Sequence, residues 1–174
     1  SEHVDLLKTL GAKHICNTGD SEFLNKLVDA IVETGATLGF DATGGGNEGK
    51  LVGQMLSAME IAANKTVTQY SRYGSDTYKQ VYIYGGLDQS PTVLNRSFGM
   101  QWGLGGWLLT PWIGKFGMET FQKMRQRVAD EIKTTFATNY TKTISFQEML
   151  QPEIIQKYAK QATGEKYLVS PHKD

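Results

Sequence analysis

The run TLGFDATGGGNEGKL, residues 37–51, brings together the residue types in this chain that most resemble a nucleotide-binding motif. Gly44, Gly46 and Gly49 fit the pattern G-x-G-x-x-G, whose glycines let a dinucleotide pyrophosphate approach the start of a helix. The same run nearly fits the phosphate-loop pattern G-x-x-x-x-G-K-[ST]. Gly44, Gly49 and Lys50 match it, but Leu51 stands where the pattern requires Ser or Thr. The two patterns predict different chemistry, so the neighbouring residues and elements must decide between them.

The phosphate-loop interpretation lacks its metal ligand. The final Ser or Thr of that loop holds magnesium, and a second strand ends in an aspartate that completes the metal site. Here Leu51 takes the place of the hydroxyl residue, and no later predicted strand supplies a clear aspartate. A phosphate-loop nucleotide-binding protein is therefore the least favoured of the functions considered.

The dinucleotide fingerprint lies between a predicted strand and a predicted helix, but two helix–strand units precede it. The fingerprint normally opens the first βαβ unit, and an acidic residue follows about 20 positions on, at the end of the next strand. Counting on from Gly44 reaches Glu60 to Lys65, which lie in the tail of a predicted helix. A tight strand-to-helix turn, where glycine tolerates positive φ, explains the same residues without a ligand.

Helices and strands alternate through the first half of the sequence. The spacing of apolar residues predicts helices at 3–12, at 19–35 (capped by Asp20 or Ser21) and from residue 51, and strands at 13–17, 36–43 and 80–87. This order predicts an α/β fold with a parallel sheet and helices on its faces. Further on, we expect a strand within 97–117, a helix at 118–136, an extended segment at 139–145 and a final strand at 166–171.

Two local signals mark the last predicted helices. Ser145 and Glu148 fit a capping box, and Pro152 suits the first position of a helix. We expect that helix to bury Ile155 and Tyr158. No internal repeat or linker divides the chain, so residues 1–174 are predicted to form a single domain.

Composition excludes several classes of partner. The 18 basic and 18 acidic residues cancel, so net charge offers no attraction to nucleic acid or to an anionic membrane. The most apolar segment is too short to span a bilayer. One cysteine, Cys16, excludes an internal disulfide framework and fits a reducing, cytoplasmic setting, with an inert thiol in a short strand. The three histidines have no ligand spacing, so no metal site is predicted.

Five segments in order carry a resemblance to a known family: LLKTLGAKHICN, ATLGFDATGGG, VYIYGG, ISFQEML and ATGEKYLVSP. Together they resemble the C-terminal part of the medium-chain dehydrogenase/reductase family, and most closely its zinc-independent, quinone-reductase-like members. The resemblance implies a Rossmann-like parallel sheet with flanking helices that lacks the first strands of the full domain. It also implies that the family's phosphate fingerprint belongs to an earlier strand, upstream of Ser1.

The resemblance implies a set of cofactor-binding residues at the ends of strands. Ligands of open α/β sheets bind beyond the carboxyl ends of the strands, where small residues let a flat nicotinamide ring approach the backbone. The residues so placed are Thr43, Gly44 and Gly45 after one strand, Tyr84, Gly85 and Gly86 after the next, and Asn17 toward the adenine end. An ordinary turn explains Asn17 equally well. The glycine-rich run is thus interpreted as a cofactor wall rather than a phosphate cradle.

Two aromatic groups remain open to more than one interpretation. The first could stack a planar ligand, but packing with a cation–π contact is the simpler expectation; it comprises Tyr70, Arg72, Tyr73 and Tyr78. The second could be core, a subunit interface or one wall of an apolar substrate pocket; it comprises Trp102, Trp107, Leu108 and Trp112. Because relatives commonly dimerise through the segment after the fifth strand, the resemblance implies a homodimer.

The implied chemistry is hydride transfer from NADH or NADPH, with NADPH favoured, to a quinone or a conjugated carbonyl compound. The sequence contains no Ser/His/Asp set, carboxylate pair or zinc ligands, so no residue is predicted to be catalytic. This chain alone is expected to be inactive. The alternative is a non-catalytic dimerisation or binding module with the same fold.

Overall fold

The computed structural model describes residues 2–65, 67–160 and 165–173. Its contacts divide the chain into two compact units, residues 13–115 and residues 1–12 together with 116–174. Each unit is described by itself, and the single domain predicted for residues 1–174 stays a prediction.

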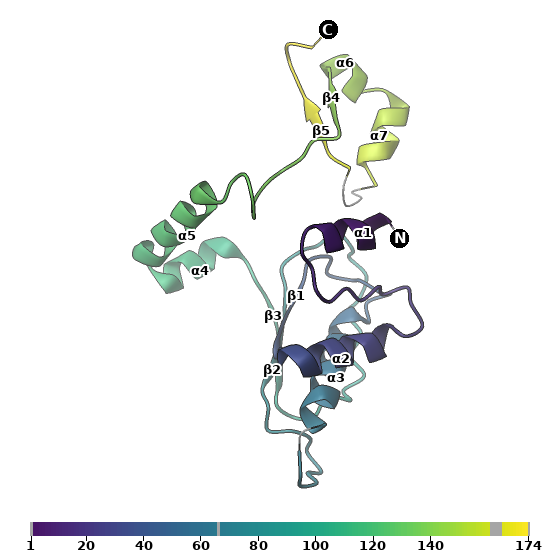
Figure 1. Ribbon diagram of the computed structural model, residues 1–174, viewed down its shortest axis with the longest axis vertical. Coiled ribbons are helices and arrows are strands. Elements are labelled where there is room, and N and C mark those ends of the chain that lie inside the picture. The colour runs from purple at the N-terminus through teal and green to yellow at the C-terminus, as the bar shows by residue number, and fades with distance from the viewer. Residues whose placement is uncertain (1, 66, 161–164, 174) are drawn as a thin grey trace. The chain divides into compact units, whose positions relative to one another are not determined.

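Residues 13–115 contain a three-stranded parallel sheet, shown in Figure 1. The elements are α2 (Phe23–Thr34), β1 (Leu38–Asp41), α3 (Leu51–Asn64), β2 (Lys79–Ile83) and β3 (Trp102–Gly106), followed by α4 (Leu109–Phe116). The strand order is β1-β2-β3, and Val81 in the central strand pairs with Gly39 on one side and Leu104 on the other. The predicted α/β fold with a parallel sheet flanked by helices is confirmed.

The core lies between one face of this sheet and the helices α2 and α3, which pack against each other. The apolar stripes that predicted the two helices supply most of it. Burying a large apolar side chain stabilises a fold by about 1.5–3 kcal/mol, and the cluster contains Val28, Ile31, Val52, Leu56, Ala58, Met59, Ala62, Val81 and Phe98.

Alternate residues of β1 face opposite sides of the sheet. Gly39 and Asp41 are buried on the helix side, whereas Leu38 and Phe40 are about half exposed on the other side. There the Phe40 ring stacks on Tyr82 of β2 at a centroid distance of 6.0 Å.

The predicted strand at 13–17 is wrong. These residues are irregular, and they pair with no strand in the part of the chain that the structure describes. An extended segment without a hydrogen-bonded neighbour is not stable as a strand. Cys16 accordingly lies in a loop, where it is half-buried rather than enclosed in a sheet.

The ends of α2 follow the sequence signals only in part. Gly35 stops the helix in a left-handed conformation, and its amide donates to the Ile31 carbonyl. At the other end the cap residue is Glu22, whose side chain makes no capping hydrogen bond, so the prediction of Asp20 or Ser21 as the cap is wrong. The Asp20 carboxylate instead accepts a hydrogen bond from the Glu22 amide, just before the helix begins.

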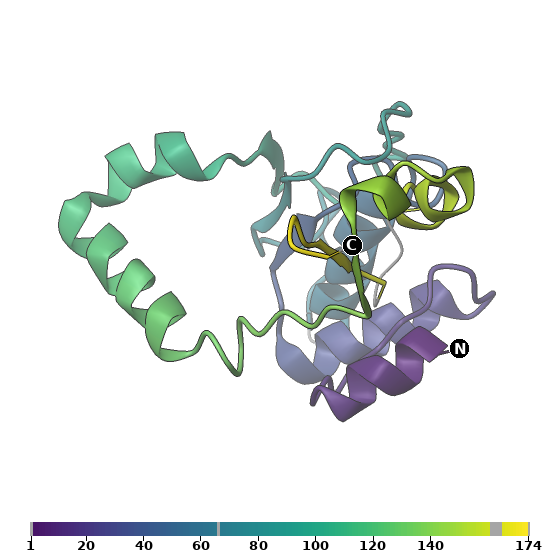
Figure 2. The ribbon, with the colours of Figure 1, turned by 90° about the horizontal axis from the view of Figure 1, so that it is seen from above.

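The other unit contains α1 (Glu2–Thr9), α5 (Met118–Asp130), β4 (Lys142–Ile144), α6 (Phe146–Met149), α7 (Pro152–Tyr158) and β5 (Tyr167–Val169). Strands β4 and β5 form a parallel pair, and in Figure 1 and Figure 2 they lie close to α6 and α7. The helix predicted at 118–136 is shorter in the structure. α5 ends at Asp130, and residues 131–136 form turns.

The capping box of Ser145 and Glu148 is present in both directions, and Pro152 opens α7 as predicted. The buried face of α7 differs from the prediction. Ile154 is buried, whereas Ile155 and Tyr158 are 38% and 42% exposed. The buried face of this short helix is therefore the one that carries Ile154, and not the expected face with Ile155 and Tyr158. Among the helices that the structure describes, none is long and apolar enough to span a membrane.

Candidate ligand-binding site

Three loops leave the sheet of residues 13–115 at the carboxyl ends of its strands. The first carries the glycine-rich turn after β1, the second follows β2 from Tyr84, and the third leads from β3 into α4. Because the strands are parallel, the three loops begin at the same edge of the sheet. This is the edge at which open α/β sheets bind their ligands.

Asp41, the last residue of β1, organises the first loop. Its side chain is 2% exposed, and its Oδ1 accepts hydrogen bonds from the Thr43 amide, the Thr43 hydroxyl and the Gly44 amide at 2.9–3.0 Å. Its other oxygen, Oδ2, is buried without a hydrogen-bond partner among the residues that the structure describes. Sequence reasoning missed this residue, although a polar side chain ending a buried strand and followed by glycines is a signal for such a turn.

The glycine-rich turn is covered by a segment of the same chain, residues 88–93. The Asp88 amide donates to the Thr43 carbonyl, and the Val93 amide donates to the Gly49 carbonyl, both at 2.9 Å. Gly49 has a φ of +78°, and a Cβ added there would lie 1.9 Å from the Pro91 carbonyl oxygen. Glycine is therefore required at position 49 because the chain's own backbone passes directly over it.

A carboxylate also lies against this turn. A Cβ added at Gly45 would lie 2.5 Å from the Asp88 carboxyl carbon. The side-chain and backbone hydrogen bonds from Ser90 lower the pKa of Asp88, which keeps the carboxylate charged. A negative charge beside the glycines disfavours a phosphate group at the same place. Lys50 is directed elsewhere, because its Nζ pairs with the Glu48 carboxylate at 2.6 Å.

The loop after β2 packs closely against the loop after β1. The Tyr84 amide donates to the Asp41 carbonyl at 3.0 Å, and a Cβ added at Gly85 would lie 1.5 Å from the Ala42 carbonyl oxygen. Gly86 differs, because no atom of the described residues lies within 4 Å of an added Cβ there. Tyr84 is 52% exposed, with its ring edge-on to Phe40.

The predicted site residues therefore separate into groups. The structure brings the segments 43–45 and 84–86 together, with Gly44 and Gly85 in direct contact. Within this set Gly44, Gly45 and Gly85 are packed against the chain, whereas Tyr84 and Gly86 face open space. Asn17 lies in the loop before α2, where its side-chain oxygen accepts a hydrogen bond from the Gly19 amide at 3.0 Å. That contact is an Asx turn, as the simpler interpretation of Asn17 expected.

A pocket of about 460 Å³ opens beside Tyr84 and Gly85, between the ends of β2 and β3 and the start of α4. Apolar and aromatic side chains line it together with polar atoms, a combination found in sites for small organic molecules. One cation lies in it: the Lys115 ammonium is 4.4 Å from the centroid of the Trp112 ring. Sequence reasoning missed Lys115, since a single lysine in an apolar helical segment gives no signal by itself.

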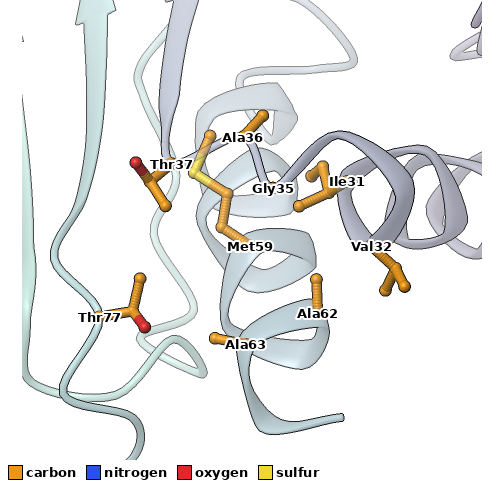
Figure 3. Close-up of a pocket in the computed structure, with 9 residues that line it drawn as sticks. All are labelled: Ile31, Val32, Gly35, Ala36, Thr37, Met59, Ala62, Ala63 and Thr77. Atoms are coloured by element: carbon orange, nitrogen blue, oxygen red, sulfur yellow. The ribbon is translucent and has the colours of Figure 1, made fainter. Parts of the chain in front are cut away.

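A second hollow of about 190 Å³ lies at the opposite, amino end of the sheet and is shown in Figure 3. The helices α2 and α3 supply its apolar wall, including Ile31, Met59 and Ala62, and Thr37 and Thr77 come from the segments before β1 and β2. It shares no lining residue with the pocket beside Tyr84.

A buried ion pair lies near that end of the sheet. Lys79 is fully buried and its Nζ lies 2.5 Å from Oε2 of Glu60. Glu60 also accepts hydrogen bonds from the Ser75 amide, the Ser75 hydroxyl and the Asn64 side chain at 2.6–2.8 Å. Burial alone would raise the pKa of Glu60, but the hydrogen bonds from Lys79, Ser75 and Asn64 outweigh it and lower the pKa to about 2. Glu60, the acidic residue found by counting on from Gly44, is therefore paired with Lys79 in the protein interior.

Other predicted features behave as ordinary structure. Arg72 lies over the Tyr73 ring at 5.3 Å, which confirms the expected cation–π contact in an exposed loop. Burial raises the pKa of the Cys16 thiol more than the nearby Lys26 lowers it, so the thiolate form is disfavoured. Within the described residues no three His, Cys, Asp or Glu side chains gather in a group that could hold a metal ion.

No family model matches this sequence, and no curated protein matches it either. Among solved structures, the chain is similar to the crystal structure of "a putative NADPH:quinone reductase" from Mesorhizobium loti, with a TM-score of 0.65 and 19% sequence identity. The two share a fold. The similarity covers 98% of this chain and 44% of the reductase chain, so this chain spans less than half of that protein. At this level of identity the match concerns the fold and not the activity.

Proposed function

We propose that this chain forms part of an oxidoreductase that transfers hydride from NAD(P)H to a quinone or a conjugated carbonyl compound. The observation that carries the proposal is the open pocket beside Tyr84 and Gly85, at the carboxyl edge of the parallel sheet. The likeness to part of a reductase structure supports the same function class.

The residues at this edge fit a nicotinamide in part. Gly86 leaves space for a flat ring to approach the backbone, and Tyr84 offers an exposed aromatic face beside it. Thr43, Gly44 and Gly45 would form the rear of that wall rather than touch the ring closely, because segment 88–93 covers the turn. A bound NAD(P)H supplies the hydride in such enzymes, and the protein orients its reactive carbon and excludes water.

The overall reaction would move two electrons. NAD(P)H would be oxidised to NAD(P)⁺, and the acceptor would gain the hydride together with one proton from solvent, which gives a hydroquinone or a saturated carbonyl compound. The apolar walls supplied by Trp107, Leu108 and Trp112 suit an acceptor of this kind. We also propose a homodimer that forms through the segment after β2. This segment contains β3, which is an edge strand of the sheet.

Titration with NADPH, followed by the intrinsic tryptophan fluorescence of the complete oxidoreductase of which this chain is proposed to be part, tests the proposal. We expect saturable quenching, and Gly86→Val should weaken binding about tenfold or more because its side chain would fill the open space. Gly114→Ala is the matched control, since an added Cβ there also meets nothing within 4 Å but lies in α4. Equal binding by both variants would refute the assignment of the cofactor wall.

A non-catalytic binding module is the second candidate. The observation that favours it is the covering of the glycine-rich turn by residues 88–93, with the Asp88 carboxylate beside Gly45. If millimolar NADPH leaves the tryptophan fluorescence of that complete protein unchanged, this candidate replaces the first.

A further inference from the structure

The pocket between β2, β3 and α4 combines flat aromatic walls with a single positive charge. Trp112 of α4 stands edge-on to Tyr82 of β2, at a centroid distance of 6.0 Å and an interplanar angle of 85°. Trp107 and Leu108, from the end of β3, form another side of the same pocket. A ligand held here would contact ring faces and edges, which favours a planar, apolar molecule.

Lys115 gives this pocket its charge. It lies one helical turn after Trp112 in α4, and its Nζ is 4.4 Å from the Trp112 ring centroid. None of the described residues that line the pocket is an aspartate or a glutamate. Among the described residues Lys115 has no carboxylate within ion-pair distance, whereas Lys26, Lys65 and Lys79 each have one. Its charge is therefore available to a ligand.

The pocket is open to solvent, and its volume is sufficient for a ligand of moderate size. About 460 Å³ accommodates a fused two-ring molecule with one substituent, within the range typical of small-molecule sites. A negatively charged substituent placed toward Lys115 would leave the rings against Trp112 and Leu108. A cationic ligand would be repelled by the Lys115 ammonium and is therefore disfavoured.

We infer that this pocket binds a planar, apolar carboxylate, with Lys115 as the residue that selects the negative charge. In the context of the proposed oxidoreductase, on which this step rests, the acceptor of the hydride would be a quinone or conjugated carbonyl compound that carries a carboxylate group. Lys115 is then a specificity-determining residue and not a catalytic one.

Calorimetric titration of the chain with 2-naphthoate and with its neutral amide, 2-naphthamide, tests the inference. We expect the carboxylate to bind about fivefold or more tightly than the amide at low salt, which is the scale of one exposed charge pair. Lys115→Met should remove that difference while it preserves binding of the amide, because methionine keeps an apolar side chain at the position. Lys13→Met, an exposed lysine outside the pocket, is the matched control and should change neither ligand.

Two results would overturn the inference: equal affinity for the two ligands in the unmodified chain, or a preference for 2-naphthoate that survives Lys115→Met. Trp112→Leu provides a second variant, and it should weaken both ligands alike by removing the ring. The titrations contain no NADPH, so they are independent of the proposed reaction. Binding of 2-naphthoate by the chain, together with a complete protein that does not bind NADPH, would leave the pocket assignment standing and remove the oxidoreductase.

Discussion

Replacing Lys79 with methionine should cost about 3–5 kcal/mol of unfolding free energy, because the Glu60 carboxylate would stay buried without its cation. Both groups are enclosed: Lys79 is 0% exposed and Glu60 is 5% exposed. The remaining donors, Ser75 and Asn64, satisfy the carboxylate only in part, since neither carries a charge. Lys65→Met is the matched control, because Lys65 pairs with Asp29 at the surface and should cost less than about 1 kcal/mol.

The dependence on pH tests the whole set of hydrogen bonds around Glu60, which includes those from Lys79, Ser75 and Asn64. The pKa of Glu60 is lowered from 4.5 in the unfolded chain to about 2 in the fold, which corresponds to about 3 kcal/mol. A lowered carboxyl pKa contributes stability that is fully present above pH 4.5 and is lost as the pH falls toward 2. In Lys79→Met the pKa of Glu60 should rise, so the stability difference from the unmodified chain should narrow as the pH falls from 5 to 3.

Urea denaturation followed by Trp102 fluorescence measures both effects. Trp102 packs against the buried Phe98 ring at 4.8 Å, so its emission reports on the core. Trp107→Phe and Trp112→Phe would make it the sole tryptophan. A double replacement, Glu60→Leu with Lys79→Met, should recover part of the loss because it removes both charges. The reasoning is refuted if Lys79→Met costs no more than Lys65→Met, or if its effect is the same at pH 7 and pH 3.

Three further substitutions test the glycine-rich loop after β1 and the start of α6. Gly49→Ala should cost at least about 2 kcal/mol in the same urea assay, because it combines a left-handed φ with a clash against the covering backbone, whereas Gly114→Ala should be neutral or slightly stabilising. Asp41→Ala should cost about 2 kcal/mol through the loss of three accepted hydrogen bonds, and wild-type stability would contradict the role assigned to Oδ1. Ser145→Ala should lose about 1 kcal/mol of local stability, seen as faster hydrogen exchange at the Glu148 amide that it caps; unchanged exchange would exclude the capping box.

Local sequence patterns predicted most of the elements because their causes are local. The apolar stripe of α2, the stop at Gly35 and the capping box at Ser145 each depend on residues within a few positions of one another. The predicted strand at 13–17 failed for the opposite reason, because a strand requires a neighbour that no local pattern supplies. The prediction that α7 buries Ile155 and Tyr158 failed for a similar reason, because the face that a short helix buries depends on the elements that pack against it.

The candidate site was predictable in outline and not in detail. The order of strands and helices was sufficient to place segments 43–45 and 84–86 at one edge of the sheet. It could not show that residues 88–93 return over the glycine-rich turn, since that contact joins positions about 40 residues apart, such as Gly49 and Val93. Lys115 was missed because its place in a pocket follows from the packing of α4 near β2.

The enclosed pair of Glu60 and Lys79 also constrains how this sequence can evolve. A chain that loses either residue alone must pass through an intermediate with a lone charge in its interior, and marginally stable proteins seldom tolerate such a step. Relatives that share this interior should therefore keep both residues or replace both together. The two positions are expected to covary even though 19 residues separate them along the chain.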